Sequence, residues 1–213
     1  MHKGRFITFE GGEGAGKSTQ VKMLAEALIK NGQKVLITRE PGGSEGGEII
    51  REILVNGDVG KWDSITEALL FYAARRDHVV KKIMPALNDG LWVISDRFAD
   101  STMAYQASGY KDGISKQELF NLHKIAIGDF KPDMTFILDL PVEKGLERAL
   151  ARSNDKSRFE KMDISFHQKL RQAFLDIAKE ENDRCVVIPA EDEITSINNK
   201  IWGSINDKFK VIF

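Results

Sequence analysis

The chain of 213 residues contains one cysteine, and no hydrophobic run in it is long enough to cross a membrane. A single cysteine excludes an internal disulfide bond. Because Cys185 lies in the apolar run 185–188, we expect it to be a small buried strand residue and not a catalytic thiol. Residues 1–9 also lack the long apolar core of a secretory signal peptide. These absences favour a cytoplasmic protein with no membrane contact.

The chain has almost no net charge, since 31 basic and 32 acidic residues leave a balance of −1. Proteins that bind nucleic acid through its phosphates need an excess of positive charge. The balance therefore disfavours a nucleic-acid-binding ATPase, and any anion site must be built locally. The histidines have no metal-ligand spacing, so no histidine metal site is expected at His2, His78, His123 or His167.

Short apolar runs alternate with amphipathic helical patterns along the chain. The runs predict strands at 6–9, 35–38, 91–95, 134–140 and 185–188. The helical patterns lie at 17–31, 45–55, 65–87, 116–127, 142–152, 164–179 and 193–208. This alternation predicts an α/β fold in one domain (1–213), with a five-stranded parallel sheet flanked by helices. Pro85 should kink or end the third helix.

Residues 11–18 read GGEGAGKS and match the phosphate-loop pattern G-x-x-x-x-G-K-[ST]. The glycines allow a tight turn whose backbone N–H groups can surround a phosphate. In this motif Lys17 carries charge to the β- and γ-phosphates, and the Ser18 hydroxyl takes a Mg²⁺ position. An empty glycine-rich turn is the alternative. The predicted strand before the loop and the helix after it favour nucleotide binding.

Charged residues follow the second and third predicted strands, and the carboxyl ends of strands face the ligand in an open α/β sheet. Asp96 is therefore placed to help hold Mg²⁺ or its waters, and Arg97 can bind a phosphate with two N–H groups. The alternative is a surface ion pair at a strand end. Arg39, followed by the glycine turn at 42–43, offers a second anion site.

Two further segments are open to a structural or a functional interpretation. Phe71 and Arg75 lie four residues apart on a predicted helix, so together they could stack on a planar base and bond its edge. Alternatively, Phe71 is a core residue and Arg75 a solvated charge. The segment 101–106 (STMAYQ) could bind a small polar ligand, or it could be a helix start that is capped by Ser101.

The polar stretch 153–157 (SNDKS) has no periodicity and lies between two predicted helices. Arginines flank it at positions 148, 152 and 158. A polar surface loop is one interpretation. Since phosphoryl transfer requires water to be excluded, we favour a lid over about 148–163 that brings Arg148, Arg152 and Arg158 onto phosphates.

The chain resembles the thymidylate kinase family, nucleoside monophosphate kinases that phosphorylate dTMP. The matching segments come in the order of the family and span most of the chain, at 9–18, 38–43, 70–75, 96–106 and 128–133. The segment 96–106 is the most specific of them. The resemblance implies a P-loop NTPase fold with a short lid, an acceptor-binding region at about 39–110 and a homodimer.

The resemblance also implies the reaction and its site. ATP·Mg²⁺ would transfer its γ-phosphoryl group to dTMP without a phosphoenzyme, giving dTDP for the dTTP pathway. The implied ATP-binding residues are Gly11, Gly12, Glu13, Gly14, Ala15, Gly16, Lys17, Ser18, Thr19 and Arg148. The implied dTMP-binding residues are Arg39, Pro41, Phe71, Arg75, Arg97, Ser101, Thr102, Tyr105 and Gln106. The Mg²⁺ ion would be held largely by nucleotide phosphates and water, with help from Ser18 and Asp96.

Individual roles follow from the same resemblance. Phe71 would stack on thymine, while Arg75 and Gln106 would bond its polar edge. Tyr105 would pack beneath the deoxyribose, and Arg39 would hold the acceptor phosphate together with Arg97. The implied catalytic residues are Lys17, Arg97, Glu13, Arg152 and Arg158. The two lid arginines are included because the phosphate loop carries no basic residue before Lys17, and the family then draws this charge from the lid.

Two other functions compete with this interpretation. A kinase for another nucleoside monophosphate or for a deoxynucleoside would share the phosphate loop and the lid, but the set formed by Phe71, Arg75, Tyr105 and Gln106 favours a pyrimidine deoxynucleotide. A nucleotide-dependent switch would carry D-x-x-G and N-K-x-D motifs. The sequence has no D-x-x-G, and the segment 199–202 (NKIW) lacks the final aspartate.

Overall fold

Five parallel strands form a single sheet in the computed structural model, which describes residues 4–56, 58, 60–109, 113–152 and 159–211. The spatial order is β2-β3-β1-β4-β5, so β1 lies at the centre. The strands are β1 (Arg5–Glu10), β2 (Val35–Arg39), β3 (Trp92–Asp96), β4 (Met134–Asp139) and β5 (Cys185–Pro189). The α/β class and the five-stranded parallel sheet predicted from the sequence are confirmed.

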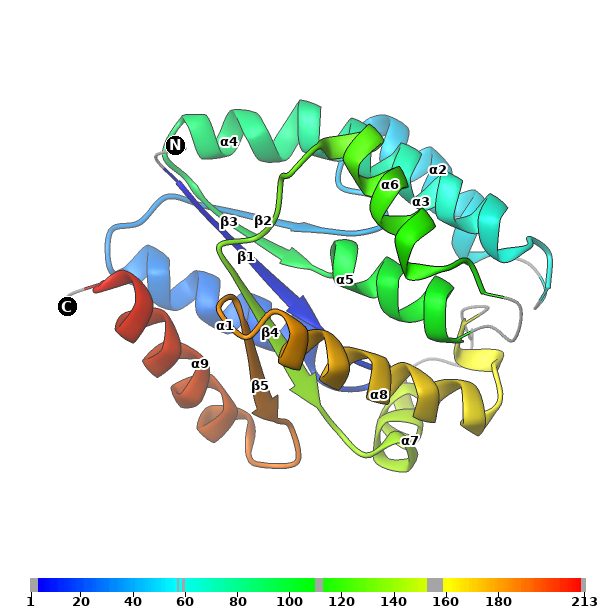
Figure 1. Cartoon of the computed structure of the whole chain (residues 1–213). Coiled ribbons are helices and arrows are strands. Elements are labelled where there is room, and N and C mark those ends of the chain that lie inside the picture. Colours follow the sequence, from blue (N-terminus) through cyan, green and yellow to red (C-terminus); the bar gives the residue numbers. More distant parts are fainter. Residues whose placement is uncertain (1–3, 57, 59, 110–112, 153–158, 212–213) are drawn as a thin grey trace.

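Helices cover both faces of the sheet (Figure 1). They are α1 (Lys17–Lys30), α2 (Glu45–Val55), α3 (Ser64–His78), α4 (Met84–Asn88), α5 (Ala99–Thr102), α6 (Lys116–Ile127), α7 (Val142–Arg152), α8 (Ile164–Glu180) and α9 (Ile194–Phe209). Helices α1 and α9 pack together on one face, and α8 packs on the other. No helix in the described ranges is both long and apolar enough to span a bilayer. The cytoplasmic location stays a prediction.

The strand register aligns the carboxyl ends of the three strands that carry the sequence motifs. Phe9 on β1 pairs with Asp96 on β3, and Asp96 pairs in turn with Arg39 on β2. Both faces of the central strands are buried, as their continuous apolar composition requires. The phosphate loop, which follows β1, therefore opens at the same edge of the sheet as the segments that follow β2 and β3.

The third predicted helix continues through Pro85, which was expected to kink or end it. Between α3 and α4 lies a π-helical turn, η1 (Val79–Ile83), in which the Met84 N–H donates to the carbonyl of Val79. Proline has no N–H and clashes with the carbonyl four residues earlier in an ordinary α-helix. The wider turn comes directly before the proline, and the helix runs on to Asn88.

The segment after β3 also differs from the expectation. The short helix α5 continues into a second π-helical stretch, η2 (Met103–Gly109), a feature often found at functional sites. Ser101 lies inside α5, whose N-cap position is taken by Phe98. The capping role considered for Ser101 is therefore wrong. Its hydroxyl instead donates to Glu10 Oε2 at 2.5 Å and so ties the helix to the end of β1.

A buried ion pair connects α5 to the residue just before β5, which is an edge strand of the sheet. Arg184, immediately before β5, donates from Nη2 and Nη1 to the two carboxylate oxygens of Asp100, both at 2.8 Å. The same Nη1 donates to Thr135 Oγ1 on β4 at 2.8 Å. The side chains of Arg184 and Asp100 are only 7% and 8% exposed. This pair fixes the helix that begins two residues after Arg97.

Candidate active site

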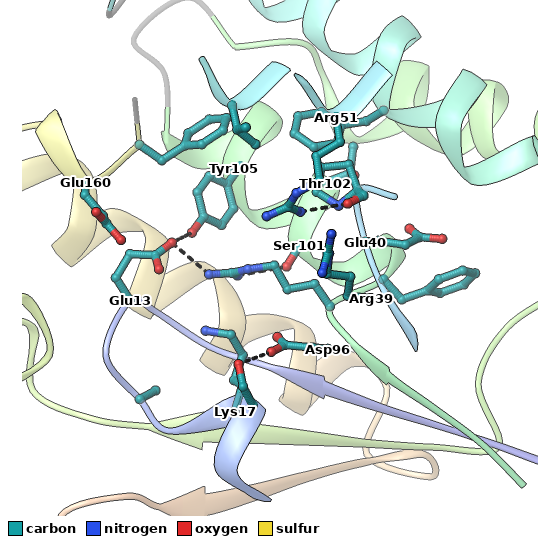
Figure 2. A pocket seen from close by; sticks show the side chains of 18 of the residues that line it. Glu13, Lys17, Arg39, Glu40, Arg51, Asp96, Ser101, Thr102, Tyr105 and Glu160 are labelled. Atoms are coloured by element: carbon teal, nitrogen blue, oxygen red, sulfur yellow. Dashed lines mark hydrogen bonds and ion pairs between the residues drawn. The ribbon is translucent and has the colours of Figure 1, made fainter. Parts of the chain in front are cut away.

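A pocket of about 440 Å³ opens at the carboxyl ends of β1, β2 and β3. Its walls come from the phosphate loop, the segment after β2, one face of α3, and α5 with η2 (Figure 2). Of the residues implied by the sequence, the pocket is lined by Glu13, Gly14, Ala15, Gly16, Lys17, Ser18, Arg39, Pro41, Phe71, Arg75, Asp96, Arg97, Ser101, Thr102, Tyr105 and Gln106. Gly11 and Gly12 line a much smaller cavity beside it, and Thr19 lines neither.

The phosphate loop needs its glycines for backbone geometry and for close packing. Gly11, Gly14 and Gly16 have φ of 129°, 69° and 91°, which residues with a side chain rarely adopt. A Cβ on Gly14 would lie 2.0 Å from the carbonyl oxygen of Gly145, and a Cβ on Gly145 would lie 2.5 Å from that of Glu13. The loop and α7 therefore touch through their backbones.

Lys17 lies in the first turn of α1 and folds back over the loop. Its ammonium donates to the carbonyls of Gly11 at 3.0 Å and Gly12 at 2.7 Å. Burial, together with the nearby charge of Arg97, lowers the pKa of Lys17 to about 8. The start of α1 adds its backbone N–H groups and its dipole. The loop is thus an electropositive concavity suited to phosphate.

Ser18 and Asp96 present the oxygen atoms that a magnesium ion prefers. The Ser18 hydroxyl donates to Asp96 Oδ2 at 2.5 Å, so a hydroxyl and a carboxylate meet at the edge of the loop. Both are hard oxygen ligands. Within the described part of the chain no three His, Cys, Asp or Glu side chains form a metal cluster. A hydroxyl and one carboxylate can supply part of the oxygen shell of Mg²⁺, an ion that usually keeps several waters and bonds substrate phosphates.

Arg97 is held in the pocket through both its backbone and its side chain. Its φ is 70°, a left-handed conformation that is costly for an arginine and typical of functional sites. The backbone N–H donates to the carbonyl of Phe9 at 2.9 Å. The guanidinium donates to Glu13 Oε1 at 2.8 Å, and to Ser101 Oγ and the carbonyl of Gly11 at 3.1 Å each. These bonds hold its fork over the phosphate loop.

Two glutamates support this arginine. Burial alone would raise the pKa of Glu13, but the charges of Arg97 and Lys17 lower it to about 2, and the Tyr105 hydroxyl donates to it at 2.9 Å. Glu13 is therefore ionised when it meets Arg97. Glu10, at the end of β1, is fully buried, and burial beside Asp100 raises its pKa. Glu10 accepts hydrogen bonds from the Phe98 N–H and from Ser101.

Arg75 is buried at 1% exposure, so its interpretation as a solvated charge is wrong. Its Nε donates to Glu40 Oε2 at 2.8 Å, and its Nη2 donates to Thr102 Oγ1 at 2.9 Å. The other oxygen of Glu40 lies 3.0 Å from Nδ1 of His78. Among the residues that the structure describes, Nη1 of Arg75 has no hydrogen-bond partner. A buried donor without a partner, in the wall of a pocket, is suited to a ligand.

Gln106 supplies the complementary acceptor. The residue is fully buried, its Nε2 donates to Glu67 Oε2 at 3.1 Å, and its Oε1 has no partner in the described ranges. Phe71, which is half-buried, places its ring 6.3 Å from that of Phe159. The pocket thus offers one donor, one acceptor and an aromatic wall, which together can bind the edge and the face of a planar ring.

Arginines gather at the wall opposite the phosphate loop, and one of them was missed by the sequence analysis. Arg39 is 54% exposed and bonds Glu48 at 2.9 Å. Arg51 on α2 donates to the carbonyl of Pro41 at 2.7 Å and lines the pocket beside Arg39. Burial and the nearby charges of Arg39 and Arg97 lower the pKa of Arg51. Its position on a helix that follows the predicted anion turn was the signal available in the sequence.

The predicted lid is only partly within the described residues. Arg148 on α7 donates to the carbonyl of Ala190 at 3.3 Å and does not line the main pocket. Arg152 ends α7, but its side chain lies outside the description, as does all of Arg158. Phe159 and Glu160, from the short 3₁₀ helix Phe159–Lys161, line the pocket. The catalytic role of the lid arginines stays a prediction.

Three comparisons with known proteins agree with one another. The family model for thymidylate kinase matches residues 9–201. A thymidylate kinase from a Bradyrhizobium species is 51% identical over 208 residues, which cover 97% of this chain and 91% of that protein. One from Caulobacter vibrioides is 51% identical, with 94% and 95% covered. A crystal structure of thymidylate kinase from Ehrlichia chaffeensis superposes with a TM-score of 0.76 at 36% identity, with 95% and 98% covered.

Proposed function

Since the chain belongs to the thymidylate kinase family, we propose that its main pocket binds dTMP beside the transferred phosphoryl group of ATP. The protein is an ATP-dependent nucleoside monophosphate kinase that phosphorylates dTMP. One observation carries the assignment of the pocket. One cavity is lined both by the phosphate loop and by Arg75 and Gln106, whose Nη1 and Oε1 atoms have no partner among the residues that the structure describes.

The acceptor base would lie against Phe71. Thymine presents a ring carbonyl and a ring N–H side by side, which the free Nη1 of Arg75 and the free Oε1 of Gln106 can bond. The Tyr105 ring lies beside this site and bonds Glu13 through its hydroxyl. We propose that Tyr105 packs beneath the deoxyribose, where it leaves no room for a 2′-hydroxyl.

The acceptor phosphate would lie among three arginines, Arg39, Arg51 and Arg97. Their positive charges lie on one side of the pocket. They can therefore bind a phosphate group, which carries nearly two negative charges. Only Arg97 also reaches the phosphate loop, through Glu13 and Gly11. We therefore assign Arg97 to both phosphates, those of the acceptor and of the transferred group, and Arg39 and Arg51 to the acceptor alone.

The donor triphosphate would occupy the loop and Lys17. Mg²⁺, which Ser18 and Asp96 would help to hold, neutralises negative charge on the ATP phosphates when it is bound. An oxygen of the dTMP phosphate attacks the γ-phosphorus, and the bond to the oxygen shared with the β-phosphate breaks, which releases ADP. The nucleophile is already anionic, so no strong base and no phosphoenzyme are needed. Lys17, Arg97 and the lid arginines stabilise the charge on the transferred group.

A coupled assay of ADP release with ATP and one monophosphate at a time tests this function. We expect strong turnover with dTMP, weaker turnover with dUMP, and little with dCMP, CMP, AMP or GMP. Chelation of Mg²⁺ with EDTA should abolish the reaction, and added Mg²⁺ should restore it. Preference for a different monophosphate would contradict the assignment of the base site. ATP binding without acceptor-dependent turnover would contradict the kinase assignment itself.

We also propose that the protein is a homodimer that associates through α2, α3 and α6. The three helices lie next to one another (Figure 1). Each carries a large apolar side chain that stays exposed, with Ile49 at 60%, Leu69 at 52% and Ile125 at 82%. Contiguous apolar patches on a protein surface mark interaction sites, and exposed apolar residues on neighbouring helices can combine into one such patch.

Light scattering coupled to gel filtration tests this proposal. We expect a dimer of about twice the 23.9 kDa chain mass for the unmodified protein. The Leu69→Glu variant should shift to the monomer, because a charge would be buried in the interface. Ile29→Glu on α1, where the isoleucine is 56% exposed, is the matched control and should stay dimeric. A monomer of the unmodified chain at micromolar concentration would contradict the proposal.

A further inference from the structure

We propose that Glu67 determines the base specificity of this enzyme by fixing which end of the Gln106 amide faces the pocket. This inference rests on the proposed function, because it concerns the same base site. Glu67 is fully buried and does not line the pocket itself. It acts through Gln106, so it is a positioning residue for specificity and not a catalytic one.

The geometry of α3 places Glu67 behind the pocket wall, where it contacts the Gln106 amide. Glu67, Phe71 and Arg75 follow one another at intervals of four on α3, so they share one face of that helix. Phe71 and Arg75 reach the pocket, while Glu67 lies one turn behind them and meets Gln106 on η2. Its Oε2 is 3.1 Å from the amide nitrogen of Gln106.

The chemistry of a carboxylate fixes the amide. Carboxylate oxygens accept hydrogen bonds, so those of Glu67 can bond the NH₂ group of Gln106 but not its oxygen. Turning the amide over would bring two oxygen acceptors together in a fully buried place, where no solvent screens their repulsion. Gln106, which lines the pocket, therefore keeps its nitrogen on Glu67 and its oxygen off that carboxylate, and the Oε1 atom has no partner among the described residues.

Arg75 supplies a donor where Gln106 supplies an acceptor, and residues other than Glu67 hold it in place. Arg75 can only donate, and its guanidinium is held in place by Glu40 and Thr102, which leaves Nη1 for the ligand. Arg75 and Gln106 both line the pocket, so its wall contains one residue fixed as a donor and one fixed as an acceptor.

This polarity selects among pyrimidines. Thymine and uracil carry N3–H and the O4 carbonyl, a donor beside an acceptor, which complements Gln106 and Arg75. Cytosine carries an unprotonated N3 and an amino group, an acceptor beside a donor, so both contacts would oppose like with like. A site whose buried polar groups stay unpaired discriminates strongly against the wrong ligand. The pair does not reach the C5 methyl group, so preference for thymine over uracil must come from other contacts.

The isosteric variant Glu67→Gln tests the role. An amide at position 67 can donate as well as accept, so the Gln106 amide could turn its NH₂ group towards the pocket without repulsion. We expect KM for dTMP to rise about tenfold and the ratio of kcat/KM for dTMP over dCMP to fall about tenfold or more, as the loss of one well-placed hydrogen bond implies. KM for ATP and kcat at saturating dTMP should stay within about twofold.

Two further variants show whether an effect of Glu67→Gln comes from the hydrogen-bonding character of residue 67 or from a general disturbance of the base site. Glu67→Asp keeps a carboxylate that only accepts, so the dTMP to dCMP ratio should stay near that of the unmodified enzyme even where KM changes. Gln106→Met removes the amide and should lower the ratio at least as far as Glu67→Gln. Thermal unfolding of each variant checks that it is folded. Should Glu67→Gln fail to fold, Glu67→Asp carries the test, and a tenfold fall of its ratio would overturn the proposal.

The outcomes distinguish this proposal from the function on which it rests. If Gln106→Met lowers the ratio and Glu67→Gln leaves it unchanged, the role of Glu67 is wrong and the base site stands. If Gln106→Met also leaves the ratio unchanged, the assignment of the base edge to Gln106 is wrong. A fall in the ratio for Glu67→Gln that Glu67→Asp does not share supports the proposal.

Discussion

Replacing Arg97 with alanine is expected to lower kcat for dTMP by on the order of a hundredfold or more, the usual effect of removing a preorganised donor to a transferred group. Arg97 is the residue that joins the acceptor side of the pocket to the phosphate loop, through Glu13 and Gly11. The alanine variant lacks the guanidinium that can bond phosphate oxygens through two N–H groups, at the place where the two phosphates meet. Steady-state kinetics with saturating ATP measures the effect.

Three variants control for this result. Arg97→Lys keeps the charge without the fork and should recover only part of the rate. Arg97→Gly removes the same side chain but suits the φ of 70°, so equal losses in the glycine and alanine variants attribute the effect to the side chain and not to backbone strain. Arg39→Ala should cost less, because Arg39 is 54% exposed and solvent screens its charge. Turnover of Arg97→Ala within a few-fold of the unmodified enzyme would refute the role.

The second large effect concerns stability. Replacing Arg184 with methionine is expected to lower the free energy of unfolding by about 3–5 kcal/mol, the typical cost of leaving one buried charge unpaired. Asp100 would lose both hydrogen bonds from the guanidinium, at 2.8 Å each, and Thr135 would lose a third. Urea unfolding followed by circular dichroism measures the change, and the slope of the transition shows whether it stays two-state.

The chain provides a matched control for this prediction. Arg171 bonds Asp139 through two N–H groups at 2.6 and 2.9 Å, but these side chains are 39% and 21% exposed. Arg171→Met should therefore cost less than about 1 kcal/mol. The double variant Asp100→Leu with Arg184→Met should recover much of the loss, because it removes both buried charges. Equal effects of Arg184→Met and Arg171→Met would show that burial does not govern the contribution of these pairs.

The parts of the fold that were predicted from the sequence depend on local patterns. The strands are continuous apolar runs because both faces of a parallel sheet are covered, and the phosphate loop has a fixed spacing that follows from the geometry of one tight turn. The rule that strand ends face the ligand then correctly placed Asp96, Arg97 and Arg39 in one pocket.

The parts that were missed depend on contacts between distant segments. The π-helical stretch η2 has no periodicity that short sequence windows can detect. Ser101 looked like a helix cap because the acceptor that its hydroxyl bonds, Glu10, lies far away in the sequence, at the end of β1. Arg51 and Glu67 sit on helices whose charged residues look like an ordinary solvated face. Only the tertiary structure brings Arg51 to the pocket and Glu67 to Gln106.

The backbone contact between the phosphate loop and α7 limits how this chain can vary over evolution or in design. A side chain at Gly14 would meet the backbone of Gly145, and one at Gly145 would meet the backbone of Glu13, so the two glycines behave as one position. No second substitution can compensate for a change at either, because the obstacle is main chain. The distance between the phosphate loop and α7, the helix that carries Arg148, is therefore set by peptide groups alone. Substitutions that change the size of side chains cannot alter it.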